Sequence, residues 1–202
     1  MIPRILNPNY KPSLKKHVVK KLVKIAPQHL FSVVTDVDSY KHFLPFCKTS
    51  QILRRSDCGT MFDASLKIGV SDMPPLNSIE EEYVSRVKYF QQLSSSGNRE
   101  WIVEAKSIKS NLFQGLSSSW KLSEVTAVQS PHHGNVTNSC DTNGTVEDEL
   151  TETALLTNVK FEVEMSVTDP IIAVALDQVL ETVALQQMEA FEKRCRDIPF
   201  HH

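Results

Sequence analysis

Long apolar runs are missing from this sequence, and so are the short motifs of several common chemistries. No stretch of the 202 residues approaches the roughly 20 consecutive apolar residues of a membrane-spanning helix, so we expect no such helix. The four cysteines form no C-x-x-C pair, which argues against zinc, a redox dithiol or a disulfide framework. We predict free thiols at Cys47, Cys58, Cys140 and Cys195.

Catalytic constellations are scarce as well. The sequence has no G-x-S-x-G segment, phosphate-binding loop, H-E-x-x-H segment or dinucleotide-binding fingerprint. Asp36 and Asp38 are two residues apart and would not share a face of a helix, so we expect them to end a helix and cap its backbone. His132 and His133 lie in a polar segment and are interpreted as surface histidines. We therefore predict no catalytic residue, no metal site and no catalytic cofactor.

The charge is nearly balanced but unevenly distributed. The chain has 22 basic and 24 acidic residues and is 41% hydrophobic, which indicates one ordinary globular domain and argues against a DNA-binding protein. The cations that precede the first acidic residue are Arg4, Lys11, Lys15, Lys16, Lys20, Lys21 and Lys24. This basic arm could meet anionic lipid or RNA, or simply be a solvated strand. Pro3, Pro8 and Pro12 argue against a long helix there, and hence against an amphipathic transit peptide.

Strict alternation of apolar and polar residues is the strongest pattern, and it predicts half-buried strands of an antiparallel sheet. Three predicted inward faces are Phe62, Ala64, Leu66, Ile68 and Val70; Leu116, Ser118, Trp120 and Leu122; and Leu155, Thr157, Val159, Phe161, Val163 and Met165. Further strands are expected around 15–25, 47–55, 79–90 and 100–108, giving about seven. Loops are expected at 71–78 and 126–148.

Helical spacing is confined to two regions. A short helix is expected at 27–37, with a further turn at 39–43. The C-terminal helix begins at Pro170, with Asp169 as its N-cap, and carries an apolar stripe of Ile172, Leu176, Val179, Leu180, Val183 and Phe191. A helix of this kind buries its stripe, and the concave face of the curved sheet is the natural partner. Periodicity leaves open whether the space between them is packed or hollow.

An aromatic turn stands out at 40–47. Phe43, Leu44 and Phe46 crowd a short connection where polar residues are the norm. They could form a plug on the core, or an exposed apolar rim at a cavity mouth that suits membrane contact.

Several segments of the chain resemble those of a known protein family. The matching segments are 30–40, 43–47, 62–69, 83–87, 112–113, 120–122 and 187–195. Over about residues 15–196 they resemble the mitochondrial coenzyme Q-binding proteins of the START-like superfamily. Segment 71–78 departs from this pattern as an insertion, and 126–148 is longer than the usual connection, which a loop tolerates at little cost.

The resemblance implies an α+β helix-grip fold, in which a curved antiparallel sheet encloses a hydrophobic tunnel around the C-terminal helix. It implies a non-enzymatic protein that binds ubiquinone or its late precursors at the matrix face of the inner mitochondrial membrane. Such a protein contacts membrane phospholipid and supports quinone synthesis and respiratory electron transfer, with quinone-synthesis proteins as further partners. We expect a basic extension at 1–14, a START-like lipid-binding domain at 15–197 and a tail at 198–202.

The apolar faces of the predicted strands and helix indicate which residues bind the ligand. The predicted tunnel lining is Leu66, Ile68, Val70, Trp120, Phe161, Val163, Ile172, Leu176 and Val179, and the predicted membrane contacts are Phe43, Leu44 and Phe46. Two alternatives stay open. The first is a ribosome-associated module that uses the basic arm and binds in a salt-dependent way. The second is a polyketide cyclase-like enzyme, for which Tyr83, Tyr89 and His42 are the candidate polar groups.

Overall fold

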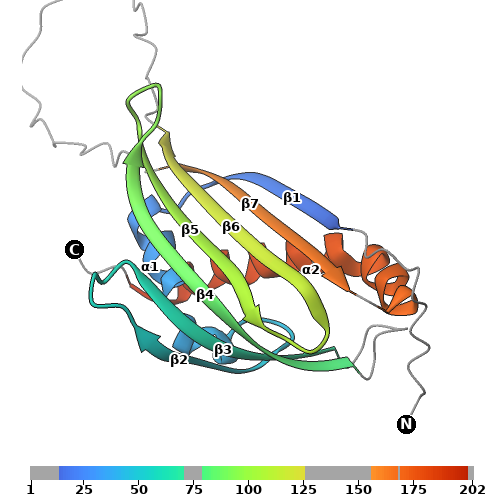
Figure 1. Cartoon of the computed structure of the whole chain (residues 1–202). Helices are drawn as coiled ribbons and strands as arrows, with labels where there is room; N and C mark the ends of the chain where they lie inside the picture. The colour runs from blue at the N-terminus through green and yellow to red at the C-terminus, as the bar shows by residue number, and fades with distance from the viewer. Residues whose placement is uncertain (1–13, 71–78, 126–155, 168, 200–202) are drawn as a thin grey trace, which may run out of the picture.

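Seven strands form one antiparallel sheet in the order β1-β7-β6-β5-β4-β3-β2 (Figure 1). The structure is a computed structural model, and it describes residues 14–70, 79–125, 156–167 and 169–199. The strands are β1 (Lys15–Val23), β2 (Cys47–Arg55), β3 (Met61–Val70), β4 (Ile79–Leu93), β5 (Arg99–Lys109), β6 (Phe113–Val125) and β7 (Leu156–Val167). The number and positions of the predicted strands are confirmed.

The first and last strands of the chain lie side by side. β1 pairs with β7, so that Val19 lies opposite Phe161, and β7 in turn pairs with β6, where Phe161 lies opposite Trp120. Apart from β1 and β7, every two neighbouring strands of the sheet are consecutive in the sequence. In the β4–β5 hairpin Gly97 has a φ of 81°, a left-handed conformation that glycine adopts without the steric cost of a side chain.

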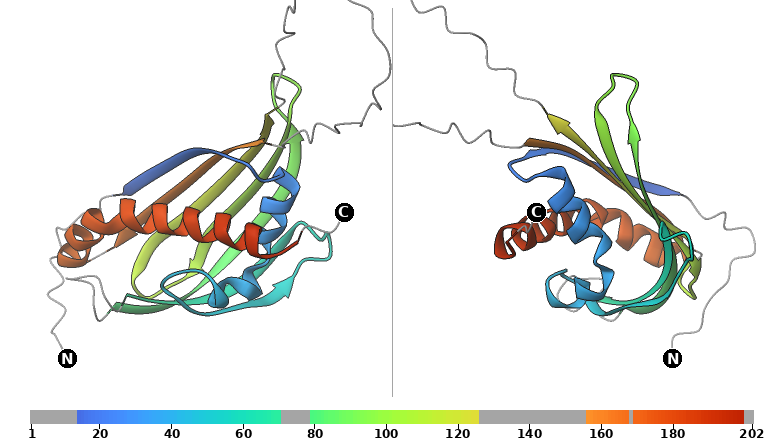
Figure 2. Two further views of the ribbon diagram at one scale, coloured as in Figure 1. Left: turned by 180° about the vertical axis from the view of Figure 1, so that it is seen from behind. Right: turned by 90° about the vertical axis from the view of Figure 1, so that its left-hand side faces the viewer.

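The long helix α2 (Pro170–Asp197) crosses the concave face of the sheet (Figure 2). The Asp169 carboxylate accepts a hydrogen bond of 3.2 Å from the Ile172 N–H, which confirms the predicted N-cap. The short helix α1 (Pro27–Thr35) and the 3₁₀ helix η1 (Val37–His42) connect β1 to β2, close to the predicted positions. In the described part of the chain no helix is long and apolar enough to cross a membrane.

The core lies where the sheet, α1 and α2 meet. The inward faces predicted from alternation are buried as expected: Phe62, Ala64, Leu122 and Val159 are each at most 1% exposed. From α2, Met188 is equally buried against them. The predicted α+β helix-grip architecture, a curved antiparallel sheet around a C-terminal helix, is therefore confirmed.

Several predictions lie outside the described residues. These are the loops at 71–78 and 126–148, Cys140, His132 and His133, and the part of the basic arm that holds Arg4 and Lys11. The proposed division into a basic extension, a domain and a tail stays a prediction.

Candidate functional site

A cavity of about 200 Å³ lies between the concave face of the sheet and α2. The sheet contributes side chains from β3 to β7, α2 contributes residues from Leu176 to Phe191, and the connection from η1 to β2 contributes residues 44–47. The space between sheet and helix, which periodicity could not decide, is therefore partly hollow.

Most of the predicted tunnel residues line this cavity. The seven that do are Leu66, Ile68, Trp120, Phe161, Val163, Leu176 and Val179. Ile172 does not border it: this side chain lies one helical turn before Leu176 and packs against the core. The side chain of Val70 lies outside the described part of the structure. That these residues contact a ligand stays a prediction.

Stacked aromatic rings form one end of the cavity. The Trp120 ring centroid lies 4.5 Å from that of Phe161 and 4.8 Å from that of Phe191, and Phe191 lies 5.3 Å from Tyr40. The Tyr40 hydroxyl donates a hydrogen bond to the carbonyl oxygen of Val34, which ties η1 to the end of α1. Edge-to-face and offset contacts of this kind add to the burial of apolar area and make this end rigid.

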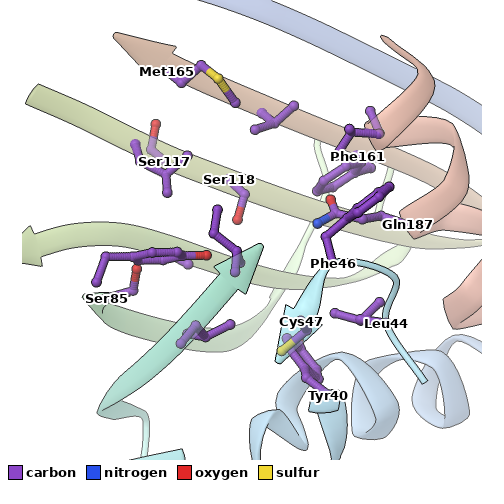
Figure 3. A pocket seen from close by; sticks show the side chains of 18 of the residues that line it. Tyr40, Leu44, Phe46, Cys47, Ser85, Ser117, Ser118, Phe161, Met165 and Gln187 are labelled. Carbon is purple, nitrogen blue, oxygen red and sulfur yellow. The ribbon is translucent and has the colours of Figure 1, made fainter. Parts of the chain in front are cut away.

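The aromatic turn faces inward in this structure. Leu44 is buried, and both Leu44 and Phe46 border the cavity, which Gln187 of α2 also lines (Figure 3). Phe43 packs on Phe191 with ring centroids 5.3 Å apart, and the Arg194 guanidinium lies over the Phe43 ring. Membrane contact by Phe43, Leu44 and Phe46 stays a prediction, and it would require these side chains to leave their present contacts.

Phe46 has an unusual backbone. Its φ of 67° lies in the left-handed region, which is uncommon for a bulky side chain and carries a steric cost. The Phe46 carbonyl accepts a 2.9 Å hydrogen bond from the Gly69 N–H, so β3 holds the loop in this conformation. Strained positions of this kind cluster at binding sites and moving segments, which makes Phe46 a candidate for the residue that moves when a ligand enters.

The cavity is polar at a few points but carries no charge. Its polar side chains are Tyr40, Cys47, Tyr83, Ser85, Ser117, Ser118 and Gln187, and no Asp, Glu, Lys, Arg or His borders it in the described part of the chain. Burial raises the pKa of Tyr40, Tyr83 and the Cys47 thiol above their ordinary values. All three are therefore protonated and neutral at pH 7. The Tyr40 hydroxyl and the Cys47 thiol already donate to the backbone carbonyls of Val34 and Thr49, whereas the Tyr83 hydroxyl has no partner in the described part of the chain.

The groups proposed for a cyclase do not come together. Tyr83 borders the cavity, whereas the Tyr89 hydroxyl donates to the carbonyl of Gly59 at the β2–β3 turn and His42 is exposed on η1. Within the described residues, no group of acidic, histidine or cysteine side chains is placed to hold a metal ion.

The two early aspartates have structural roles. The Asp38 carboxylate accepts a 2.7 Å hydrogen bond from the Ile52 N–H and ties η1 to β2. Asp36 is the residue at which α1 ends, and its N–H donates to the Ser32 carbonyl at 3.1 Å. The predicted helix end at Asp36 is confirmed, but the predicted helix cap is wrong: the Asp36 carboxylate makes no capping hydrogen bond within the described residues, and the Asp38 carboxylate bonds to strand β2 instead.

The described part of the basic arm is largely paired within the protein. Its ion pairs are Lys15 with Asp177, Lys16 with Glu162 and Glu164, and Lys21 with Glu192. These contacts fasten the edge strand β1 to β7 and α2. They also neutralise much of the positive charge that suggested an anionic partner.

Of the polar residues at the cavity, Tyr83 was named from the sequence as a possible functional group, whereas the serines and Gln187 were passed over. Ser118 was placed on the correct face of β6, and Ser85 lies between Tyr83 and Val87 on the inward face of β4. The available signal was a polar residue that interrupts an apolar face, and Gln187 interrupts the apolar stripe of α2 in the same way.

Comparison with known proteins agrees with the predicted resemblance. The chain is 31% identical over 109 residues to a mitochondrial coenzyme Q-binding protein of Dictyostelium discoideum, covering 54% of this chain and 46% of that protein. It is 41% identical over 76 residues to the Drosophila melanogaster protein of the same name, covering 36% of this chain and 28% of that protein. The chain thus spans less than half the length of these relatives.

Solved structures share the fold at low sequence identity. An aromatase/cyclase from a Streptomyces species has a TM-score of 0.58 at 12% identity, with 91% of this chain and 94% of that chain covered. An 18 kDa protein from Caulobacter crescentus has a TM-score of 0.56 at 19% identity, with 91% and 97% covered. The model of the polyketide cyclase/dehydrase and lipid transport family matches residues 23–192, and this chain therefore belongs to that family.

Proposed function

We propose that this protein binds a quinone of the coenzyme Q type, or a late precursor of it, in the cavity between the sheet and α2. We propose further that it acts without catalysis, as a carrier on the matrix side of the inner mitochondrial membrane that supports quinone synthesis and respiratory electron transfer. The observation that carries the proposal is an uncharged cavity with apolar and aromatic walls in a chain similar to coenzyme Q-binding proteins.

The size of the cavity indicates which part of the ligand it holds. Its volume of about 200 Å³ slightly exceeds that of a cavity of about 150 Å³ known to bind benzene, and lies below the range of about 300–1,000 Å³ typical of pockets for drug-sized ligands. The cavity as it stands therefore suits one substituted ring and the beginning of a tail. Most of a long polyprenyl tail would lie outside it, which suits a protein that works against a membrane.

The energetics of transfer favour the same setting. Burying a tail from water would contribute about 0.8 kcal/mol per CH₂ group, but a tail that starts in a bilayer is already in an apolar medium. The hydrophobic contribution then nearly cancels, and uptake and release are close to balanced. A path through water would cost the full hydrophobic term, so exchange requires contact with the membrane.

The chemistry of the lining supports binding without catalysis. A general acid–base pair needs groups whose pKa values lie near the working pH. The titratable groups at the cavity are Tyr40, Tyr83 and Cys47, and burial moves the pKa of each further from neutrality. These groups can orient a neutral ligand, but they offer no base at pH 7.

The proposal is tested by quinone transfer from donor to acceptor vesicles that contain anionic phospholipid. We expect the protein to accelerate transfer of a ubiquinone well above the rate in buffer. We expect Phe46→Ala to slow this transfer more than it weakens equilibrium binding, because Phe46 is the predicted moving and membrane-contacting residue. Failure of the wild-type protein to bind or transfer quinone, together with salt-sensitive co-sedimentation with ribosomes, would contradict the proposal and favour the ribosome-associated alternative.

A further inference from the structure

Four hydroxyl groups at the cavity have no hydrogen-bond partner within the described residues, those of Tyr83, Ser85, Ser117 and Ser118. Tyr83 and Ser85 on β4 and Ser118 on β6 belong to the inward face of the sheet, whereas Ser117 is one residue out of phase with that face. Ser85 is only 5% exposed, and its side chain points into the cavity, as does that of Ser118 (Figure 3). Buried polar groups in proteins are nearly always hydrogen-bonded, so the unpaired hydroxyl of the buried Ser85 needs an explanation.

The other buried hydroxyls among the described residues are paired. The Ser50 hydroxyl, which is 2% exposed, bonds to the backbone of η1, and the Thr157 hydroxyl donates to the carbonyl of Ile25. The hydroxyls of Tyr40 and Tyr89 also donate to backbone carbonyls. The unpaired hydroxyls of Tyr83, Ser85 and Ser118, by contrast, all border the hollow space.

The register of the strands places Ser85 and Ser118 near each other on the concave face of the sheet. Ser85 lies opposite Ser107, and Ser118 lies opposite Ala105, which is two residues away on the same strand β5. Two strand spacings of about 4.8 Å and an offset of two residues put the Ser85 and Ser118 Cα atoms roughly 12 Å apart on a flat sheet. The serines are thus far enough apart for a ring with an oxygen on each side to lie between them and to accept a hydrogen bond of about 2.8 Å from each hydroxyl.

The side chain between the two serines is small, and the neighbouring side chains are aromatic. Ala105 is the side chain between the two serines, so nothing large fills the space above it. Trp120 follows Ser118 on the same face of β6, and Phe161 lies opposite Trp120 at a ring centroid distance of 4.5 Å. A flat ring above the serines would therefore meet aromatic side chains at its edge, a favourable geometry for aromatic pairs.

We propose that Ser85, Ser118 and Tyr83 form the head-group subsite, where their hydroxyls donate hydrogen bonds to the carbonyl and alkoxy oxygens of a substituted benzoquinone. This inference rests on the proposed function and gives the ligand an orientation within the cavity. A quinone ring is neutral and offers only acceptors, which matches a subsite of neutral donors. The remaining apolar lining, which includes Leu116, Met165 and Leu176, is left to the first part of the tail.

The test compares two ligands of equal tail length. Isothermal titration calorimetry in dilute detergent measures the affinity for a ubiquinone with two isoprene units and for a ring-less polyprenol with the same tail. The variants are Ser85→Ala, Ser118→Ala and Tyr83→Phe, each of which removes only a hydroxyl. Ser119→Ala is the matched control, because Ser119 neighbours Ser118 but lies on the opposite face of β6 and does not border the cavity.

We expect each cavity variant to weaken quinone binding about 2- to 10-fold, the effect of one hydrogen bond, and to leave polyprenol binding unchanged. Ser119→Ala should bind both ligands as the wild type does. The infrared carbonyl band of the bound quinone should also lie at lower frequency in the wild type than in Ser118→Ala, because hydrogen bonding weakens the C=O bond. This shift reports the contact itself and does not depend on a stability change.

Two results would overturn the subsite while leaving the proposed function intact. In the first, all three variants bind the quinone as tightly as the wild type and show the same carbonyl band. In the second, the variants lose affinity equally for quinone and polyprenol, which would mean that the hydroxyls only shape the cavity. A wild-type protein that binds neither ligand, or the polyprenol alone, would overturn both the function and the subsite.

Discussion

The concave and the convex face of the sheet differ in whether their polar side chains have hydrogen-bond partners. On the concave face, the hydroxyls of Ser85 and Ser118 border a hollow space and have no partner in the described part of the chain. On the convex face, polar side chains pair with one another across the strands. Asp63 and Arg86, for example, form a two-point contact at 2.8 and 3.1 Å.

The convex pairs form a continuous pattern across the sheet. They include Lys16 with Glu162 and Glu164, Ser65 with Glu82, Lys121 with Glu100, and Gln92 with Glu100. Such pairs on a sheet surface fix its register and keep it soluble in contact with water. Many polar groups of the convex face thus find their partners within the protein, whereas the hydroxyls of Ser85 and Ser118 on the concave face face the cavity.

The largest effect should come from placing a charge in the cavity. Leu66→Lys puts an ammonium group among apolar side chains with no carboxylate at the cavity, and an uncompensated buried charge costs about 3–5 kcal/mol. We expect ubiquinone affinity to fall more than 100-fold, measured by quenching of Trp120 fluorescence. The matched control is Ser65→Lys, which changes the neighbouring residue on the opposite face of β3 and should bind normally.

Circular dichroism shows whether both lysine variants are folded. Retention of quinone by a folded Leu66→Lys protein at wild-type affinity would contradict the assignment of the cavity as the ligand site.

The exposed thiol of Cys58 should react with an alkylating reagent at least ten-fold faster than the thiol of Cys47 at the cavity. Cys58 is exposed, and hydrogen bonds with Ser56 and Thr60 lower its pKa to about 7. Cys47 borders the cavity, and burial raises its pKa. At pH 7 about half of Cys58 is thiolate and almost none of Cys47, so iodoacetamide should label Cys58 first.

Peptide mass spectrometry over a time course measures both labelling rates, with Cys58→Ser as the control. Bound quinone should slow Cys47 further and leave Cys58 unaffected. Equal rates at the two cysteines would show that the cavity is open to solvent, against the burial described above.

The smallest effect should come from a substitution on the convex face that changes how steeply stability falls at low pH. Lys121 first, and then Gln92, hydrogen-bond to Glu100 and hold its pKa below the ordinary value. A depressed carboxyl pKa in the folded state stabilises the protein above the unfolded pKa of about 4.3, and this contribution is lost as the pH falls through the folded value. Glu100→Gln should therefore flatten the decline in stability below about pH 5.

Urea unfolding midpoints at pH 7 and pH 4 measure this slope, and quinone affinity at pH 7 should not change. An unaltered slope would show that the Glu100 contacts contribute no net stability, and a loss of quinone binding would show that the two faces are coupled.

The sequence predicts the sheet better than it predicts the site. Alternation identified β3, β6 and β7 most clearly, because one buried and one solvated face leave a period of two in the side chains. It also assigned Phe161 and Val163 correctly to the concave face. Alternation could not tell Ile172, which packs on the core, from Leu176, which borders the cavity, because both belong to the same helical stripe.

The hollow itself could not be predicted from the sequence. A cavity arises where small and large side chains from distant strands meet, as Ala105 and Trp120 do across the β5–β6 pair. The inward orientation of Leu44 depends likewise on the packing of η1 against β2, and no local pattern encodes it. Whether a hydroxyl such as that of Ser85 has a partner also depends on residues from distant segments, and the sequence alone does not reveal it.

The most direct test of quinone binding is the identity of the lipid that the protein carries from the cell. The purified protein is extracted with organic solvent, and the extract is analysed by mass spectrometry. We predict an isoprenoid quinone in near-stoichiometric amount, and its mass would give the tail length in the same step. Phospholipid alone, or an empty extract from a folded protein, would contradict the assignment of this cavity to a quinone.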